Sequence, residues 1–187
     1  DVVSFAYNYE NVRLNKGEIR RKDIVYNYRY AGGDVTIYKM TGKQLKDYME
    51  WAADYFDTIH SGDTEYRYNG ERAGRKYVTF DIFGGVKYKI DLRNEKGNKI
   101  TDLMLVNGKE ITSGMELKVG MNAYRFEQLA RKGGIFDGQE IPVLWASKEA
   151  IGEIDGTIQN MMIDYIKNVK NGIIEGKSHN NWEIIGL

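Results

Sequence analysis

A strand-like segment that runs directly into a capped amphipathic helix is the feature that most constrains this fold. Residues 35–40 predict a strand, and Thr41 follows as an N-cap, with Gln44 three residues later completing a capping box. Apolar side chains then recur at helical spacing and predict one buried face: Leu45, Tyr48, Met49, Ala52 and Phe56. Charged side chains occupy the opposite face of this helix: Lys43, Lys46, Asp47, Glu50 and Asp54.

The other periodic segments mix strands and helices without regular alternation. Strands are expected at residues 2–6, 77–83, 86–92, 99–106, 117–124 and 182–185, and further helices at 125–132 and 157–169. The dipeptide Asn107-Gly108 predicts a hairpin, and the polar segment 58–76 predicts a long surface loop. This pattern is typical of an α+β fold, and we expect a single domain over residues 1–187.

Composition excludes several classes of protein. The chain has 187 residues, with 27 Lys and Arg against 27 Asp and Glu, and no cysteine. A zero net charge argues against binding nucleic acid through bulk electrostatics. Without cysteine there is no disulfide, zinc ribbon or thiol nucleophile. No apolar run approaches the roughly 20 residues of a membrane span. Because the chain begins inside a predicted strand, we expect it to be a piece of a longer protein.

Sequence motifs for catalysis are missing. The two histidines, His60 and His179, lie in no metal-binding spacing, and we expect both at the surface. There is no GxSxG elbow, no Walker loop and no GxGxxG after a strand. The pairs Gly32-Gly33, Gly84-Gly85 and Gly133-Gly134 predict turns. An independent enzyme is therefore disfavoured.

Aromatic residues near these glycine pairs are the most informative side chains. Phe80, Phe83 and Tyr124 each lie at or near a predicted strand end. Aromatic faces in such places stack on planar ligands such as nucleobases. The alternative interpretation is that they are core side chains at alternate strand positions, and composition alone favours the core.

Several motifs, in order along the chain, resemble the C-terminal domain of bacterial and animal 5'-nucleotidases. The helix starts Thr-Gly-Lys-Gln-Leu-Lys at residues 41–46, and residues 80–91 end in the pattern GVxYxID. Residues 121–125 run Met-Asn-Ala-Tyr-Arg, like the family's NNYR, and Gly133-Gly134 follows. The tail Asn180-Asn181-Trp182 is similar to the branch of 2',3'-cyclic-nucleotide 2'-phosphodiesterase/3'-nucleotidases.

The resemblance implies a two-domain hydrolase of which this chain is the substrate-binding part. In the family, an N-terminal metallophosphoesterase domain carries two divalent metal ions and the catalytic His and Asp residues. The C-terminal domain holds the nucleoside between two aromatic rings. We therefore expect no catalytic residue, metal ligand or cofactor in this chain. The expected partners are a nucleoside or nucleotide and the catalytic domain of the same polypeptide. The family implies a place outside the cytoplasm, whether periplasm, cell wall or secreted.

Site residues follow from the same resemblance. Phe80 matches the first stacking aromatic, with Phe83 as the alternative, and Tyr124 matches the second. Asn122 and the pair Gly133-Gly134 match the loop that borders the base.

Two departures leave the substrate open between 2'-, 3'- and 5'-phosphates. The family's GGIR corresponds to residues 7–13, where only Arg13 can take the place of the substrate-reading arginine. The family's GGDG corresponds to residues 133–136, Gly-Gly-Ile-Phe, which lack the acidic residue. These departures favour the cyclic-nucleotide branch, and they also keep a non-catalytic binding or adhesion module as the alternative function.

Overall fold

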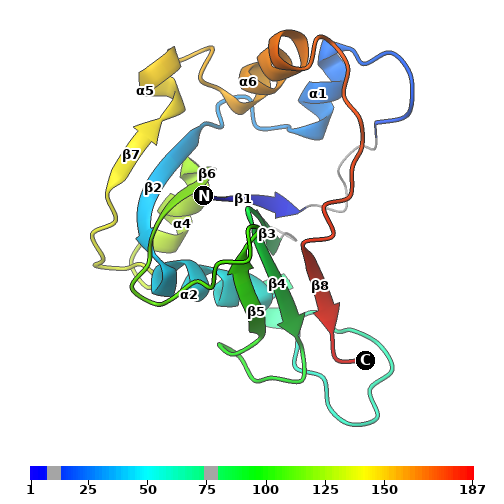
Figure 1. Cartoon of the computed structure of the whole chain (residues 1–187), viewed down its shortest axis with the longest axis vertical. Coiled ribbons are helices and arrows are strands. Elements are labelled where there is room, and N and C mark those ends of the chain that lie inside the picture. Colours follow the sequence, from blue (N-terminus) through cyan, green and yellow to red (C-terminus); the bar gives the residue numbers. More distant parts are fainter. Residues whose placement is uncertain (8–13, 74–79) are drawn as a thin grey trace.

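A five-stranded sheet forms the middle of the molecule (Figure 1). The computed structural model describes residues 1–7, 14–73 and 80–187. The strand order is β3-β1-β6-β2-β7, in which β1 is antiparallel to β3 and parallel to β6, and β2 is antiparallel to β6 and β7. The bounds are β1 Val2–Tyr7, β2 Val35–Thr41, β3 Phe80–Gly84, β6 Glu116–Asn122 and β7 Val143–Ala146.

Helix α2 (Gly42–Ala53) begins where the capping box predicts. The Gln44 backbone N–H donates to Thr41 Oγ1 over 3.2 Å, and the Thr41 N–H donates to Gln44 Oε1 over 2.8 Å. The predicted apolar face is buried, with Leu45, Tyr48 and Met49 at 0% exposure. This face packs on β2, β3 and β6, while α4 (Ala123–Ala130) packs beside it through Phe126, which stacks on Tyr38.

The prediction that the acidic residues Glu50 and Asp54 face solvent is wrong. Glu50 and Asp54 are only 8% and 9% exposed. The Glu50 carboxylate accepts the backbone N–H groups of Lys99 and Ile100 over 2.8 and 3.0 Å, which ties α2 to the start of β5. Helical periodicity places Glu50 on the charged face of the helix. It does not show that the backbone N–H groups of Lys99 and Ile100 need an acceptor there.

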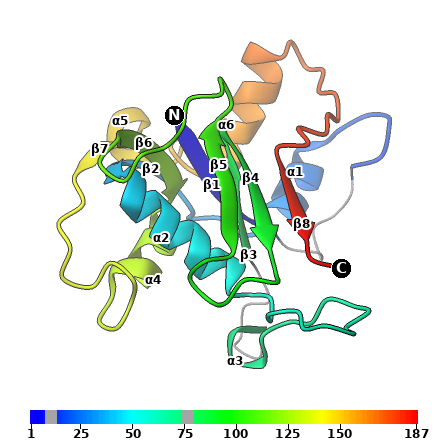
Figure 2. The ribbon, with the colours of Figure 1, turned by 60° about the horizontal axis from the view of Figure 1, so that its bottom comes forward.

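A second sheet of three strands has the order β5-β4-β8 and contacts the other side of α2 (Figure 2). Its strands are β4 Val86–Asp91, β5 Ile100–Leu105 and β8 Trp182–Ile185. The predicted antiparallel pairing of β4 and β5 is confirmed. Gly85 connects the two sheets at φ +85°, and a Cβ there would lie 2.1 Å from the Asp1 carbonyl oxygen, so the position requires glycine. The expected hairpin after Asn107-Gly108 is reduced to a turn and one bridge, Met104 to Glu110.

The remaining helices lie at the periphery. Helix α1 (Arg21–Asn27) contacts α6 (Ile158–Asp164), and α6 continues as a π-helical turn, η1 (Tyr165–Val169). Two short helices are α3 (Gly70–Ala73) and α5 (Ser147–Ile151). The sequence analysis did not predict α1, α5 or β7, and α3 lies within the segment 58–76 that was expected to be a loop. Residues 77–79 of one expected strand lie outside the described residues. Among the residues that the structure describes, none of the helices has the length and apolar composition of a membrane span. The α+β class is confirmed.

Candidate functional site

Asn122 lies where β6 ends and α4 begins. The strand predicted over 117–124 stops two residues early, because Asn122 caps the helix: its Oδ1 accepts the Tyr124 backbone N–H over 2.8 Å. Tyr124 therefore belongs to the first turn of α4 rather than to a strand, and its side chain is 52% exposed.

The loop before β2 lies beside this turn. Val35, the first residue of β2, pairs with Asn122, and the Ala123 N–H donates to the Asp34 carbonyl over 3.3 Å. Asn122 also reaches into the loop, where its Nδ2 donates to the Tyr28 hydroxyl. One side chain thus orients both the helix turn and the loop.

Tyr28 has a fixed, protonated hydroxyl. Burial raises the pKa of Tyr28 to about 12, although the hydrogen bond from Asn122 works in the opposite direction. A Cβ at Gly33 would lie 2.2 Å from this hydroxyl, so any larger residue there would have to displace the Tyr28 ring. The glycine predicted as a turn residue is therefore needed for close approach of the Tyr28 ring.

Tyr30 contributes a second exposed ring, which lies beside Tyr28. Its ring packs edge-to-face against Tyr28, with centroids 5.6 Å apart, and it is 63% exposed. Through Tyr28 and Asn122, the Tyr30 ring is connected to the turn that carries Tyr124. The sequence analysis missed this residue, although Tyr28 and Tyr30 precede Gly32-Gly33 and so meet the same criterion that selected Phe80 and Tyr124.

The far side of the loop is held by the C-terminal part of the chain. Gln159 Nε2 donates to the Tyr28 carbonyl over 2.7 Å, and the Ile158 N–H donates to the Gly33 carbonyl over 2.8 Å. Ser147 is fully buried; its Oγ accepts the Val35 N–H over 3.0 Å and donates to the Gly156 carbonyl over 2.6 Å. Backbone hydrogen bonding therefore fixes residues 28–34, the loop that carries Tyr30 and is called the Tyr30 loop below.

A buried ion pair lies under the first turn of α4. Arg125 contacts Asp81 with one edge of its guanidinium, Nε to Oδ2 at 2.8 Å and Nη2 to Oδ1 at 3.0 Å. The Asp81 side chain is 1% exposed. Tyr48 donates its hydroxyl proton to Asp81 over 2.5 Å, and burial holds the pKa of Tyr48 well above its usual range. Since that proton is used, the Ser4 hydroxyl donates to Tyr48 over 3.0 Å.

The two phenylalanine candidates differ in accessibility. Phe83 is 2% exposed and packs edge-on against Tyr48, with centroids 5.0 Å apart, so its ring lies in the core. Phe80 is half-buried and packs against Phe56 and Trp182, with centroid distances of 5.2 and 6.0 Å. Because β1 separates β3 from β6, the Phe80 backbone is two strands away from β6.

The glycine pair lies at the other end of α4. Gly133 and Gly134 follow the helix C-terminus, where the Gly134 N–H donates to the Arg131 carbonyl over 2.7 Å. Eight helical residues separate them from Asn122, a rise of about 12 Å. Arg13 lies outside the described residues. The structure thus brings Asn122 and Tyr124 together and leaves the glycine pair apart.

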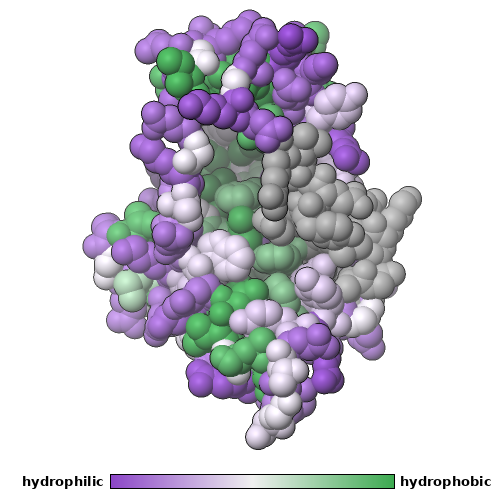
Figure 3. All heavy atoms as spheres, turned by 90° about the vertical axis from the view of Figure 1, so that its right-hand side faces the viewer, coloured by the Kyte–Doolittle hydropathy of each residue, from purple (hydrophilic) through white to green (hydrophobic). Residues whose placement is uncertain are grey.

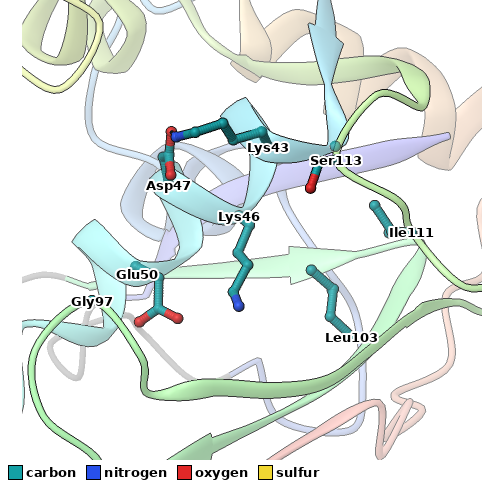
Figure 4. A pocket seen from close by; sticks show the side chains of 9 residues that line it. Lys43, Lys46, Asp47, Glu50, Gly97, Leu103, Ile111 and Ser113 are labelled. Carbon is teal, nitrogen blue, oxygen red and sulfur yellow. Dashed lines mark hydrogen bonds and ion pairs between the residues drawn. The ribbon is translucent and has the colours of Figure 1, made fainter.

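Two other concave regions carry none of the predicted site residues. A polar hollow between α2 and β5 is lined by Lys43, Lys46, Asp47 and Glu50 (Figure 4). Lys43 pairs with Asp47 at 2.6 Å, and Glu50 binds backbone N–H groups. A shallow apolar hollow is lined by Ile37, Leu144 and Trp145 with Lys118. Figure 3 shows hydrophobic atoms in a recess below the upper part of the molecule, which holds α1 and α6. His60 and His179 are exposed, and the described residues contain no cluster of metal-ligating side chains.

Comparison with known proteins agrees with the resemblance. A model of the family "5'-nucleotidase, C-terminal domain" matches residues 2–131. The trifunctional nucleotide phosphoesterase YfkN of Bacillus subtilis is 30% identical over 193 residues, covering 96% of this chain and 12% of that protein. A 2',3'-cyclic-nucleotide 2'-phosphodiesterase/3'-nucleotidase of Haemophilus influenzae is 24% identical, covering 93% of this chain and 27% of that protein.

A solved structure shares the fold. A Staphylococcus aureus protein assigned as a 5'-nucleotidase, in complex with alpha-ketoglutarate, superposes with a TM-score of 0.76 at 20% identity. It is matched over 98% of this chain and 33% of its own length. The chain therefore spans a third or less of these relatives. With a family model over more than half of its residues, the chain belongs to the 5'-nucleotidase C-terminal domain family.

Proposed function

We propose that this domain binds the nucleoside part of a nucleotide by stacking the base between the rings of Tyr30 and Tyr124. The observation that carries the proposal is the double contact of Asn122, which caps the Tyr124 turn and bonds the Tyr28 hydroxyl beside Tyr30. Both rings are more than half exposed. Each offers a π-face to any base, which suits a site of broad base preference.

Tyr30 takes the place that the sequence analysis assigned to Phe80. The half-buried Phe80 ring packs against other aromatic rings at the far side of β1. Tyr30 instead belongs to the loop that Asn122 contacts. Phe80 remains the alternative first ring, and the experiment below separates the two.

The reaction of the whole protein is part of the same proposal. Named relatives are nucleotide phosphoesterases, and they are several times longer than this chain. We propose that a metallophosphoesterase domain elsewhere in the polypeptide, with two divalent metal ions, hydrolyses the phosphoester of a nucleotide presented here, outside the cytoplasm. Hydrolysis of 2',3'-cyclic AMP and 3'-AMP by the full polypeptide, and its loss with a chelator, tests this part.

The binding test is titration of the chain with adenosine and AMP, followed by calorimetry. Stacking is worth roughly 1–3 kcal/mol per base, so Tyr30→Ala and Tyr124→Ala are each expected to weaken binding by about fivefold to more than a hundredfold. Tyr26→Ala is the matched control, because Tyr26 is a tyrosine of similar exposure, 57%, on the neighbouring α1.

The outcomes separate the candidates. Weakening by Phe80→Ala and not by Tyr30→Ala restores Phe80 as the first ring. Unchanged affinity in Tyr124→Ala overturns the stacking site. The departure at residues 133–136 favours one other function, a non-catalytic binding module. Nucleoside binding without hydrolysis by the metal-loaded full polypeptide supports that alternative.

A further inference from the structure

We propose that Arg125 and Asp81 are positioning residues of the stacking site, whose buried ion pair holds the first turn of α4 and so fixes the Tyr124 ring for the base. The inference rests on the proposed function, because it concerns the same ring. Nothing in the family comparison assigns a role to either residue.

The geometry of the pair is specific. The guanidinium meets the carboxylate side-on, through Nε at 2.8 Å and Nη2 at 3.0 Å, and this two-point contact fixes orientation as well as distance. Arg125 also stands over the Trp51 ring of α2, with Cζ 5.2 Å from the centroid. The arginine is therefore held by β3 and α2 together.

The carboxylate is itself held in place. Asp81 accepts the Tyr48 hydroxyl from α2, and Tyr48 accepts Ser4 from β1. A side chain that is 1% exposed and bound by two donors has no room to follow a moving partner. The network therefore joins β1, α2 and β3 to one residue of α4.

Tyr124 precedes Arg125 on the same helical turn. Its backbone is held on the other side by the Asn122 cap. Arg125 on one side and Asn122 on the other leave the Tyr124 Cα little freedom, while the ring itself is 52% exposed. A ring that is already in place when the base arrives avoids the ordering cost of binding.

A double-mutant cycle on the 187-residue chain tests the inference, with adenosine as the probe. We expect Arg125→Met to raise the Kd about tenfold when Tyr124 is present, because the binding-competent turn is then populated only part of the time. In the Tyr124→Ala background the same change is expected to raise the Kd by less than about twofold. Arg131→Met is the matched control, since Arg131 is an exposed arginine at the other end of α4.

Each result has a defined meaning. Equal weakening in both backgrounds overturns the inference, because Arg125 then acts on the ligand or the fold and not through Tyr124. Unchanged affinity in Arg125→Met, with clear weakening in Tyr124→Ala, overturns it as well and leaves the stacking site standing. Unchanged affinity in Tyr124→Ala overturns the proposed function first.

Arg125→Lys covers the case in which Arg125→Met fails to fold. Lysine keeps the charge for Asp81 but loses the side-on contact. We expect an intermediate Kd that again depends on the Tyr124 ring, whereas wild-type affinity in a folded Arg125→Lys chain rejects the requirement for the two-point contact.

Discussion

The two rings of the proposed site are held in different ways. Tyr124 rests on side chains: a capping asparagine and a buried ion pair that reaches Asp81 on β3. Tyr30 lies in a loop that is held through its backbone, by Gln159 and Ile158 of α6. The family model covers the whole Tyr124 support, but it ends at residue 131, before the helix that holds the Tyr30 loop. The support of Tyr124 thus lies within the residues that the family model matches, whereas the loop that carries Tyr30 also depends on residues 158 and 159, which follow them.

Loss of the ion pair is expected to have the largest effect on stability. Arg125→Met leaves the buried Asp81 carboxylate without its cation, and breaking a buried pair in this way typically costs about 3–5 kcal/mol. Urea unfolding followed by circular dichroism measures the change. Arg131→Met, at an exposed position, is expected to stay within about 0.5 kcal/mol of wild type. A loss below about 1 kcal/mol for Arg125→Met contradicts the buried pair.

Crowding the Tyr30 loop is expected to have the second-largest effect on stability. Gly33→Ala places a Cβ 2.2 Å from the Tyr28 hydroxyl, so the ring must shift, and overpacking of this kind costs about 1–3 kcal/mol. Because Tyr28 supports Tyr30, nucleoside binding is expected to weaken as well. The neighbouring Gly32→Ala is the control, since its Cβ meets nothing within 4 Å. Equal behaviour of the two variants in unfolding and titration contradicts this account.

Removing one hydrogen bond to the backbone of the Tyr30 loop tests whether the C-terminal segment supports the Tyr30 ring alone. Gln159→Met deletes the hydrogen bond to the Tyr28 carbonyl, worth about 1 kcal/mol, while keeping the length of the side chain. Adenosine affinity is expected to fall severalfold in the wild-type background and to stay nearly constant when Tyr30→Ala is already present. If Gln159→Met weakens binding with Tyr30→Ala present but not with Tyr124→Ala present, the Gln159 hydrogen bond supports the Tyr124 ring and this prediction is wrong.

The sequence predicted the parts of this site that depend on local patterns. The capping box at Thr41 and Gln44, the strand that ends near Asn122, and the turn at Gly32-Gly33 are all encoded by short spacings. These patterns were enough to predict the α+β class, and with the family resemblance they made Tyr124 a candidate for the site.

The missed parts depend on contacts between distant residues. Arg125 and Asp81 are 44 positions apart, and Gln159 lies 131 positions from Tyr28. Glu50 has the spacing of a solvent-facing residue but is buried against the start of β5. No local periodicity identifies which charge meets which partner, so these contacts appear only once the sheets are assembled.

Alkaline pH is expected to act on the support of the Tyr30 ring through the Tyr28 hydroxyl. The pKa of Tyr28 is about 12 in the folded protein, against an ordinary value near 10, because burial disfavours the phenolate. Between these values the folded chain holds a proton that the unfolded chain has released. The contribution of the Tyr28 hydroxyl to stability is therefore fully present below pH 10 and is lost as the pH rises toward 12.

Tyr28→Phe removes this contribution, and the unfolding free energy of the variant is expected to fall less steeply over that interval. Burial also holds the pKa of Tyr48 well above its usual range, and this contribution stays in the variant. Parallel pH profiles for Tyr28→Phe and wild type contradict the burial of this hydroxyl.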